Sequence, residues 1–186
     1  MTAQMPDEVF FEGEQFAVAA VDGTGLFDPR EHDLEPQALH TACYRGRICH
    51  YAVVDRRLVL RELELGSENE PARIDGVRAR RDEEFGSWHY QGLAVPVAFT
   101  GRLLIGSGGI DDRPHLNMGF RPAWMFAEVH ELTFRAGELV AADDCSAAIA
   151  EIRPDMIAKP AEGESTEDWI HRTFSLTYEY SWPGRG

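Results

Sequence analysis

Strict alternation of large apolar and polar residues marks the C-terminal part of the chain. Between residues 173 and 182 every second position is large and apolar: Phe174, Leu176, Tyr178, Tyr180 and Trp182. Successive side chains of a β-strand point to opposite faces, so this pattern predicts a strand with one buried face. Residues 92–99 alternate in the same way, with Leu93, Val95, Val97 and Phe99 on one face. Pro96 falls on the other face and predicts an edge strand or a bulge, because proline cannot donate a backbone hydrogen bond.

Paired strands are the simplest interpretation of three further stretches. Residues 47–55 (RICHYAVVD) and 56–65 (RRLVLRELEL) read as two strands joined by a tight turn near Asp55. In the second strand the apolar positions change parity across Arg61–Glu62, which predicts a β-bulge. Residues 128–143 predict another hairpin that turns around residues 135–138, and residues 14–23 predict one more strand.

Helical patterns are short. Ser146 is placed to cap a helix that Pro154 would end, and Ser165 with Asp168 forms a second capping pair just before the predicted C-terminal strand. Seven to nine strands at roughly ten-residue spacing predict an antiparallel β-sandwich or barrel with a minor helical part. We expect residues 1–186 to form a single domain.

Three stretches resemble segments of small uncharacterised bacterial proteins that are rich in β-structure. Residues 41–65 are similar to a segment in which an Arg-Gly-aromatic step enters a strand, and a turn then leads into a leucine-rich strand. Residues 87–97 (SWHYQGLAVPV) are similar to a Trp-aromatic-x-Gly segment of that group. Residues 115–140 are similar to its His-Met-Gly-aromatic segment, which a paired strand follows. The resemblance implies a mostly β protein and implies no activity.

Charge limits the partners that this protein can have. The formal net charge is −14 and the sequence pI is about 4.8. Phosphate-rich nucleic acid and anionic membrane surfaces are therefore poor partners, because both require a basic protein surface. A basic protein partner fits this charge, and a homodimer stays open.

The compartment follows from what the sequence lacks. Residues 1–10 are acidic and have neither the basic nor the apolar region of a signal peptide, and no apolar run approaches the roughly 20 residues of a membrane span. Three cysteines, an odd number, fit a reducing compartment. One lysine beside seventeen arginines is a bias associated with bacterial GC-rich genomes. We expect a bacterial cytoplasmic protein.

The stretch RLLIGSGGIDDRPHLNMGF, residues 102–120, is the nearest approach to a catalytic signature. It lacks the third glycine of a dinucleotide-binding loop, and the pair Asp111–Asp112 would place negative charge where a phosphate sits. Backbone freedom explains its glycines better than a nucleotide does. Its acids and His115, brought together with His130, are the candidate catalytic residues.

Metal and ligand sites are weakly indicated. The histidines show no ligand spacing, although His50, His89 and His130 with Glu128 could meet from separate strands. We expect neither a metal nor a cofactor. Large aromatic residues could line a closed sheet that holds a small apolar ligand, and the candidates for that role are Trp88, Tyr90, Phe120 and Trp124.

Three hypotheses about function follow. The first is a non-enzymatic interaction protein, of the immunity or antitoxin kind, that uses its acidic surface to bind a basic partner. The second is a β-barrel that binds a small apolar ligand. The third is a small hydrolase or isomerase that uses Asp111, Asp112 and His115 with His130. Whether the protein is an enzyme stays open at this point.

Overall fold

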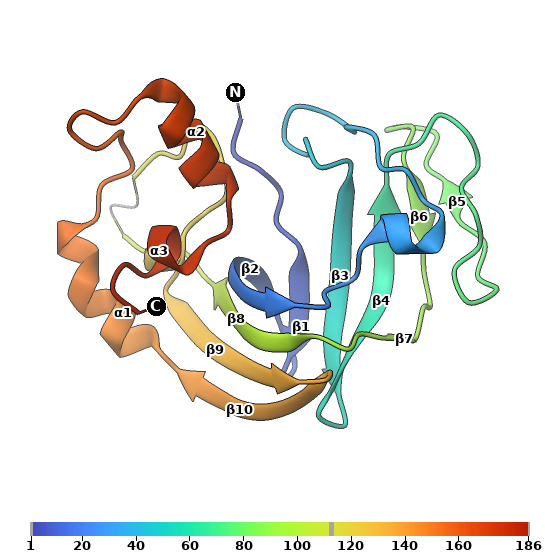
Figure 1. Cartoon of the computed structure of the whole chain (residues 1–186), viewed down its shortest axis with the longest axis horizontal. Coiled ribbons are helices and arrows are strands. Elements are labelled where there is room, and N and C mark those ends of the chain that lie inside the picture. Colours follow the sequence, from blue (N-terminus) through green and yellow to red (C-terminus); the bar gives the residue numbers. More distant parts are fainter. Residues whose placement is uncertain (1, 112–113, 186) are drawn as a thin grey trace.

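A computed structural model describes residues 2–111 and 114–185 of the chain. It is mainly β, with a closed seven-stranded barrel, three outer strands and a few short helices (Figure 1). The strands are β1 Glu8–Phe11, β2 Glu14–Thr24, β3 Arg47–Val54, β4 Arg57–Leu65, β5 Arg80–Arg81, β6 Trp88–Tyr90, β7 Val95–Pro96, β8 Thr100–Ser107, β9 Glu128–Arg135 and β10 Glu138–Asp144. The α-helices are α1 Ser146–Ile152, α2 Thr166–Phe174 and α3 Tyr178–Ser181. The prediction of a mainly β protein is confirmed, and the barrel is the form it takes.

The barrel is closed by one narrow contact. Its strands follow the order β10-β9-β8-β2-β1-β3-β4, and β10 then meets β4 at the single pair Glu138–Arg57. All these pairings are antiparallel except that of β1 with β3, which is parallel. The outer strands β6 and β5 extend the sheet from one part of β4, and β7 pairs with another part of it.

The two hairpins predicted from the sequence are present. Strands β3 and β4 are joined through Asp55 and Arg56, which both adopt positive φ angles of 48° and 61°. The register of this pair shifts between His50 and Tyr51, which face Glu62 and Leu60, so Arg61 is the extra residue of a bulge. The parity change in the sequence therefore located the bulge correctly. Strands β9 and β10 turn at Ala136 and Gly137, as predicted.

Side chains fill the barrel interior. The four alternating residues of the 92–99 segment are all buried, while Pro96 is exposed on the short edge strand β7, as predicted. They join one continuous core whose largest fully buried members include Tyr51, Leu58, Leu60, Leu63, Leu65, Tyr90, Phe99 and Phe134. Close packing of this kind leaves little free volume in a small barrel.

A second core covers the outer face of β2, β8 and β9. Ala19, Ala20, Leu104 and Val129 supply the sheet side of this core, and the covering side chains come from the segment after β8 and from the C-terminal helices. The covering residues include Trp124, Phe126, Ile149, Tyr178 and Trp182. Figure 1 shows these helices grouped against one side of the barrel. The predicted helix at Ser146 is α1, and it contributes Ile149.

The predicted C-terminal strand is wrong. Residues 173–182 instead contain the end of α2 and the short helix α3. An alternating pattern also places residues four apart on the same side of a helix, and Tyr178 and Trp182, which are four apart, both pack into the second core. The burial differs from strict alternation, because Thr173 and Ser181 are buried while Phe174 and Leu176 are only half-buried. Alternation alone therefore did not reveal the helices.

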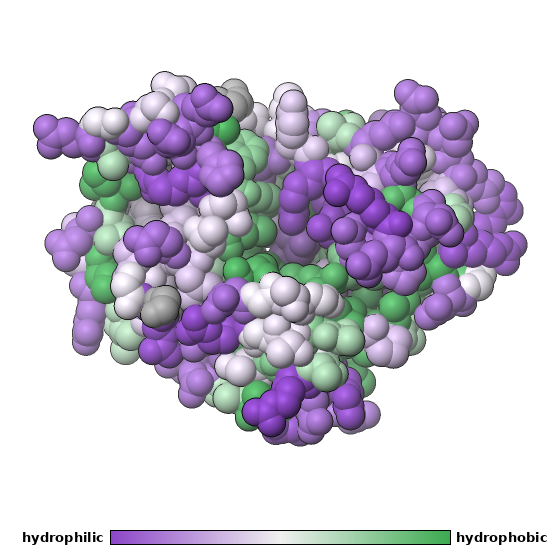
Figure 2. All heavy atoms as spheres, viewed as in Figure 1, coloured by the Kyte–Doolittle hydropathy of each residue, from purple (hydrophilic) through white to green (hydrophobic). Residues whose placement is uncertain are grey.

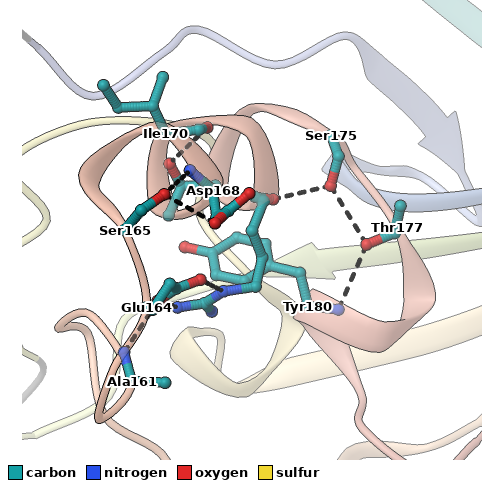
Figure 3. A network of polar contacts seen from close by, with 10 residues as sticks. Ala161, Glu164, Ser165, Asp168, Ile170, Ser175, Thr177 and Tyr180 are labelled. Atoms are coloured by element: carbon teal, nitrogen blue, oxygen red, sulfur yellow. Dashed lines mark hydrogen bonds and ion pairs between the residues drawn. The ribbon is translucent and has the colours of Figure 1, made fainter.

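Local hydrogen bonds cap the ends of the two helices that replace the predicted strand, α2 and α3 (Figure 3). Ser165 caps α2, because its hydroxyl accepts a hydrogen bond from the backbone N–H of Asp168. At the other end the Ser175 hydroxyl donates to the carbonyl of Arg172 at 2.7 Å. The Thr177 hydroxyl then accepts from the N–H of Tyr180 and caps α3. The capping pair predicted at residues 165 and 168 is present, but it starts a helix that reaches Phe174.

Acid should loosen this helical segment. The Glu164 carboxylate accepts hydrogen bonds from Nε and Nη2 of Arg172 at 2.7 and 2.8 Å, and these bonds lower its pKa from 4.5 to about 2. A lowered pKa means that the contact stabilises the fold fully above pH 4.5 and is lost as the pH falls toward 2. We expect Glu164→Gln to remove part of the acid sensitivity of the thermal midpoint in this interval. Equal pH dependence in both proteins, measured by circular dichroism, would contradict this assignment.

Candidate functional site

The glycine-rich loop and His130 lie on opposite faces of the sheet. Strand β8 ends at Ser107, Asp111 is exposed in the turn that follows, and Asp112 lies outside the described residues. His115 borders a surface hollow of about 410 Å³ together with Gln4, Ala17, Arg121 and Phe126. This hollow lies on the outer face of the barrel, because Phe126 covers Gly106 and belongs to the second core.

His130 points instead toward the barrel interior. Its ring packs edge-on against Phe11 and Phe16, with ring centroids 5.9 and 5.3 Å away, and both phenylalanines belong to the interior core. Its Nε2 lies 2.7 Å from Oε1 of Glu128. The sheet therefore separates His130 from His115, and the geometry does not assemble the acid–base site suggested by the sequence.

A second group of catalytic residue types meets on the outer strands, and the sequence analysis missed it. The Ser87 hydroxyl lies 2.8 Å from Nε2 of His89, and carboxylate oxygens of Glu64 and Asp82 lie 3.7 and 3.9 Å from the same nitrogen. A catalytic triad needs the acid on Nδ1, so that Nε2 is free to take the proton of the nucleophile. Ser87 is also fully buried. The group therefore joins β6 to its neighbours and is not arranged for nucleophilic catalysis.

The histidines considered as metal ligands are dispersed. His50 lies on the outer face of β3, where Nδ1 is 3.1 Å from Oε2 of Glu8, and this hydrogen bond raises the pKa of the imidazole. His89 on β6 contacts Ser87, and His130 faces the interior. Within residues 2–111 and 114–185, no cluster of three or more histidine, cysteine or acidic side chains is placed to hold a metal ion.

The four aromatic candidates for ligand binding do not line a common cavity. Trp88 and Tyr90 are buried in the interior core, whereas Trp124 lies in the second core on the outside of the sheet. Phe120 is covered by Phe174, 6.3 Å away, and by the guanidinium of Arg45, 4.7 Å above its ring. Each of these rings packs against other protein side chains.

One edge of strand β10 is largely unpaired. This strand pairs with β9 from Glu138 to Asp144, with a bulge at Val140. On its other side it meets β4 only at Glu138, next to the hydrogen bond from Leu139 N–H to the Arg56 carbonyl. Strand β7 occupies the following part of β4, at Val59 and Leu60. Among the described residues, no strand pairs with the second side of residues 140–144. We call this segment the open edge.

The open edge is exposed on both faces and is acidic at one end. All five of its residues are exposed: Val140, Ala141, Ala142, Asp143 and Asp144. Asp144 accepts a hydrogen bond from the backbone N–H of Ser146, and bonds to Ser146 lower the pKa of the Asp144 carboxyl, so that it is ionised at neutral pH. The sequence carries one signal of this edge, because Asp143 and Asp144 place a charged residue on each face of the strand.

Hydrophilic side chains cover much of the face shown in Figure 2, with apolar patches between them. Among the described residues, no helix is both long enough and apolar enough to cross a membrane.

The chain is therefore a mainly β protein with a closed barrel whose interior is occupied by core side chains, and with one open edge along β10. No family model, no curated protein and no solved structure matches the chain. The resemblance to uncharacterised bacterial β-rich proteins stays a prediction.

Proposed function

We propose that this is a non-enzymatic binding protein that recognises a basic protein partner through its acidic surface, with the open edge inside the interface. The observation that carries the proposal is the open edge itself, where unpaired strand backbone lies beside Asp143 and Asp144 in a chain of net charge −14. Exposed strand edges are sites of association, and negative charge selects a positive partner. An immunity or antitoxin role, in which an acidic protein blocks a basic one, is one form of this function.

The other two hypotheses have less support. An apolar ligand would need interior space, but the core side chains of the barrel pack against one another. A hydrolase would need the loop residues and His130 on one side of the sheet. Binding through the acidic surface requires neither arrangement.

A labelled peptide of about eight residues that alternates lysine and valine is a suitable basic probe, because its charge is opposite to that of the open edge and it is long enough to span the five residues of that edge. We expect it to bind the wild-type protein at about 20 mM salt and to lose at least about tenfold in affinity at about 200 mM. The edge variant Asp143→Lys with Asp144→Asn keeps a side-chain oxygen at position 144 that can accept the hydrogen bond from the Ser146 N–H. It should weaken binding about tenfold at low salt, which corresponds to about 1.4 kcal/mol. Fluorescence anisotropy measures each affinity.

The matched control changes the same charge elsewhere. Glu83→Lys with Glu84→Gln alters two exposed residues between β5 and β6, and both double variants raise the net charge by three units. We expect this hairpin variant to bind within about twofold of the wild type. Equal weakening in both variants would show that diffuse charge attracts the probe. No salt-dependent binding by the wild type would reject the proposed function.

A further inference from the structure

We propose that the open edge binds its partner by strand addition, in which an extended basic segment pairs with residues 140–144 and continues the sheet beyond β10. This inference rests on the proposed function and specifies how the partner is recognised. Five residues of strand span about 17 Å at roughly 3.4 Å per residue, so the edge offers backbone pairing for a segment of similar length. Main-chain hydrogen bonds then supply affinity, and the flanking side chains supply specificity.

The side chains of the open edge leave room for an added strand. Val140, Ala141 and Ala142 are small, and they are exposed on both faces of the sheet. Helix α1 begins at Ser146, after the open edge has ended, and directs Ile149 into the second core. Figure 1 shows β10 forming the border of the barrel, with α1 following its end. The incoming segment would therefore meet exposed backbone and small side chains.

Charges at the two ends of the open edge determine the direction in which the incoming segment lies. Asp143 and Asp144 lie at the end where the chain enters α1, whereas Arg56 and Arg57 lie near the other end. The Arg56 guanidinium donates to the carbonyl of Leu139, which holds this positive group beside the start of the open edge. A segment with lysine or arginine toward the two aspartates and apolar β-branched residues toward Val140 complements this pattern.

A second copy of the chain is a poorer occupant. Two copies that each carry a net charge of −14 repel one another. The opposite end of the sheet, β5, has the complementary residues Arg80 and Arg81, but it is only two residues long and Asp82 follows it. The open edge is longer than β5 can cover, which favours an extended segment from another protein.

Backbone N-methylation of the basic probe tests strand addition without changing its charge. In a β-strand the N–H groups of alternate residues point to the same side. Methylating the backbone nitrogen of every lysine therefore blocks one edge of the peptide, and methylating the backbone nitrogen of every valine blocks the other edge. A peptide that adds to β10 uses one edge only. We expect one methylated peptide to lose at least about tenfold in affinity and the other to stay within about twofold of the unmodified probe.

The outcomes separate this inference from the proposed function. If both methylated peptides bind as the unmodified probe does, or lose affinity equally, strand addition is overturned, and the basic-partner function stands on the unmodified probe. If the unmodified probe fails to bind, the proposed function itself is lost. Concentration-dependent assembly of the wild-type protein that the edge variant abolishes, measured by sedimentation, would assign the open edge to a second copy and would also overturn the inference.

Discussion

Replacing Phe99 by alanine is expected to lower the free energy of unfolding by about 3–5 kcal/mol, as is usual for a fully buried phenylalanine. Phe99 has no exposed surface in the barrel interior, and its ring packs edge-on against Phe134 with ring centroids 6.0 Å apart. The backbone carbonyl of Phe99 also accepts a hydrogen bond from Gly137, so the residue lies where β10 begins. Chemical denaturation monitored by circular dichroism measures the change.

The same substitution at an exposed phenylalanine provides the control. Phe10 on β1 is 46% exposed, and Phe10→Ala should change the free energy of unfolding by less than about 0.5 kcal/mol. A cost below about 1 kcal/mol for Phe99→Ala would mean that the barrel interior is loosely filled. That result would revive the hypothesis of an apolar ligand, because a loosely filled barrel has room for one.

Glu131→Ala is expected to lower the free energy of unfolding by about 2 kcal/mol, because it removes the buried carboxylate that accepts a hydrogen bond from Arg185 and holds the C-terminal segment on the sheet. Glu131 is 4% exposed on the outer face of β9. Its Oε1 accepts a hydrogen bond from Arg185 at 3.0 Å, and its Oε2 lies 3.7 Å from Nη1 of Arg102. Tyr178 of α3 lies beside Glu131. Burial raises the pKa of the Tyr178 phenol, and the negative charge of Glu131 raises it further.

Two variants distinguish loss of this contact from a general effect on β9. Glu128→Ala removes a carboxylate that is 45% exposed on the same strand and should cost less than about 1 kcal/mol. Glu131→Gln keeps the shape of the side chain without its charge and should fall between the wild type and Glu131→Ala. The measurement is again denaturation, together with the fluorescence of Trp182, which packs beside Tyr178 in the second core. Equal costs for Glu128→Ala and Glu131→Ala would contradict the assignment.

Local pairing was predictable because both partners of a hairpin lie close together in the sequence. The β3–β4 pair and its bulge at Arg61 follow from the apolar positions of one 19-residue stretch, residues 47–65. The sequence does not show that β1 would lie parallel to β3, or that β10 would close the barrel against β4 through one residue pair. These contacts join segments far apart in the chain, and no local pattern specifies them.

The site residues also divide into features that local sequence predicts and features that depend on distant contacts. The net negative charge follows from composition, but the open edge depends on β7 occupying the adjacent part of β4. The contact between Ser87 and His89 was missed because no strand was predicted over residues 87–89, where an i, i+2 pair lies on one face. The burial of Glu131 was also missed, because it depends on Arg185, 54 residues further along the chain.

The most direct test of the central claim is the ratio of two dissociation constants for the basic probe, one for the edge variant Asp143→Lys with Asp144→Asn and one for the hairpin variant Glu83→Lys with Glu84→Gln. Because both variants carry the same change in net charge, the ratio reports where the probe binds and is insensitive to total charge. Binding at the open edge predicts that the edge variant binds at least about five times more weakly than the hairpin variant at about 20 mM salt. A ratio near one would contradict the account, because it would mean that the open edge has no special part in binding.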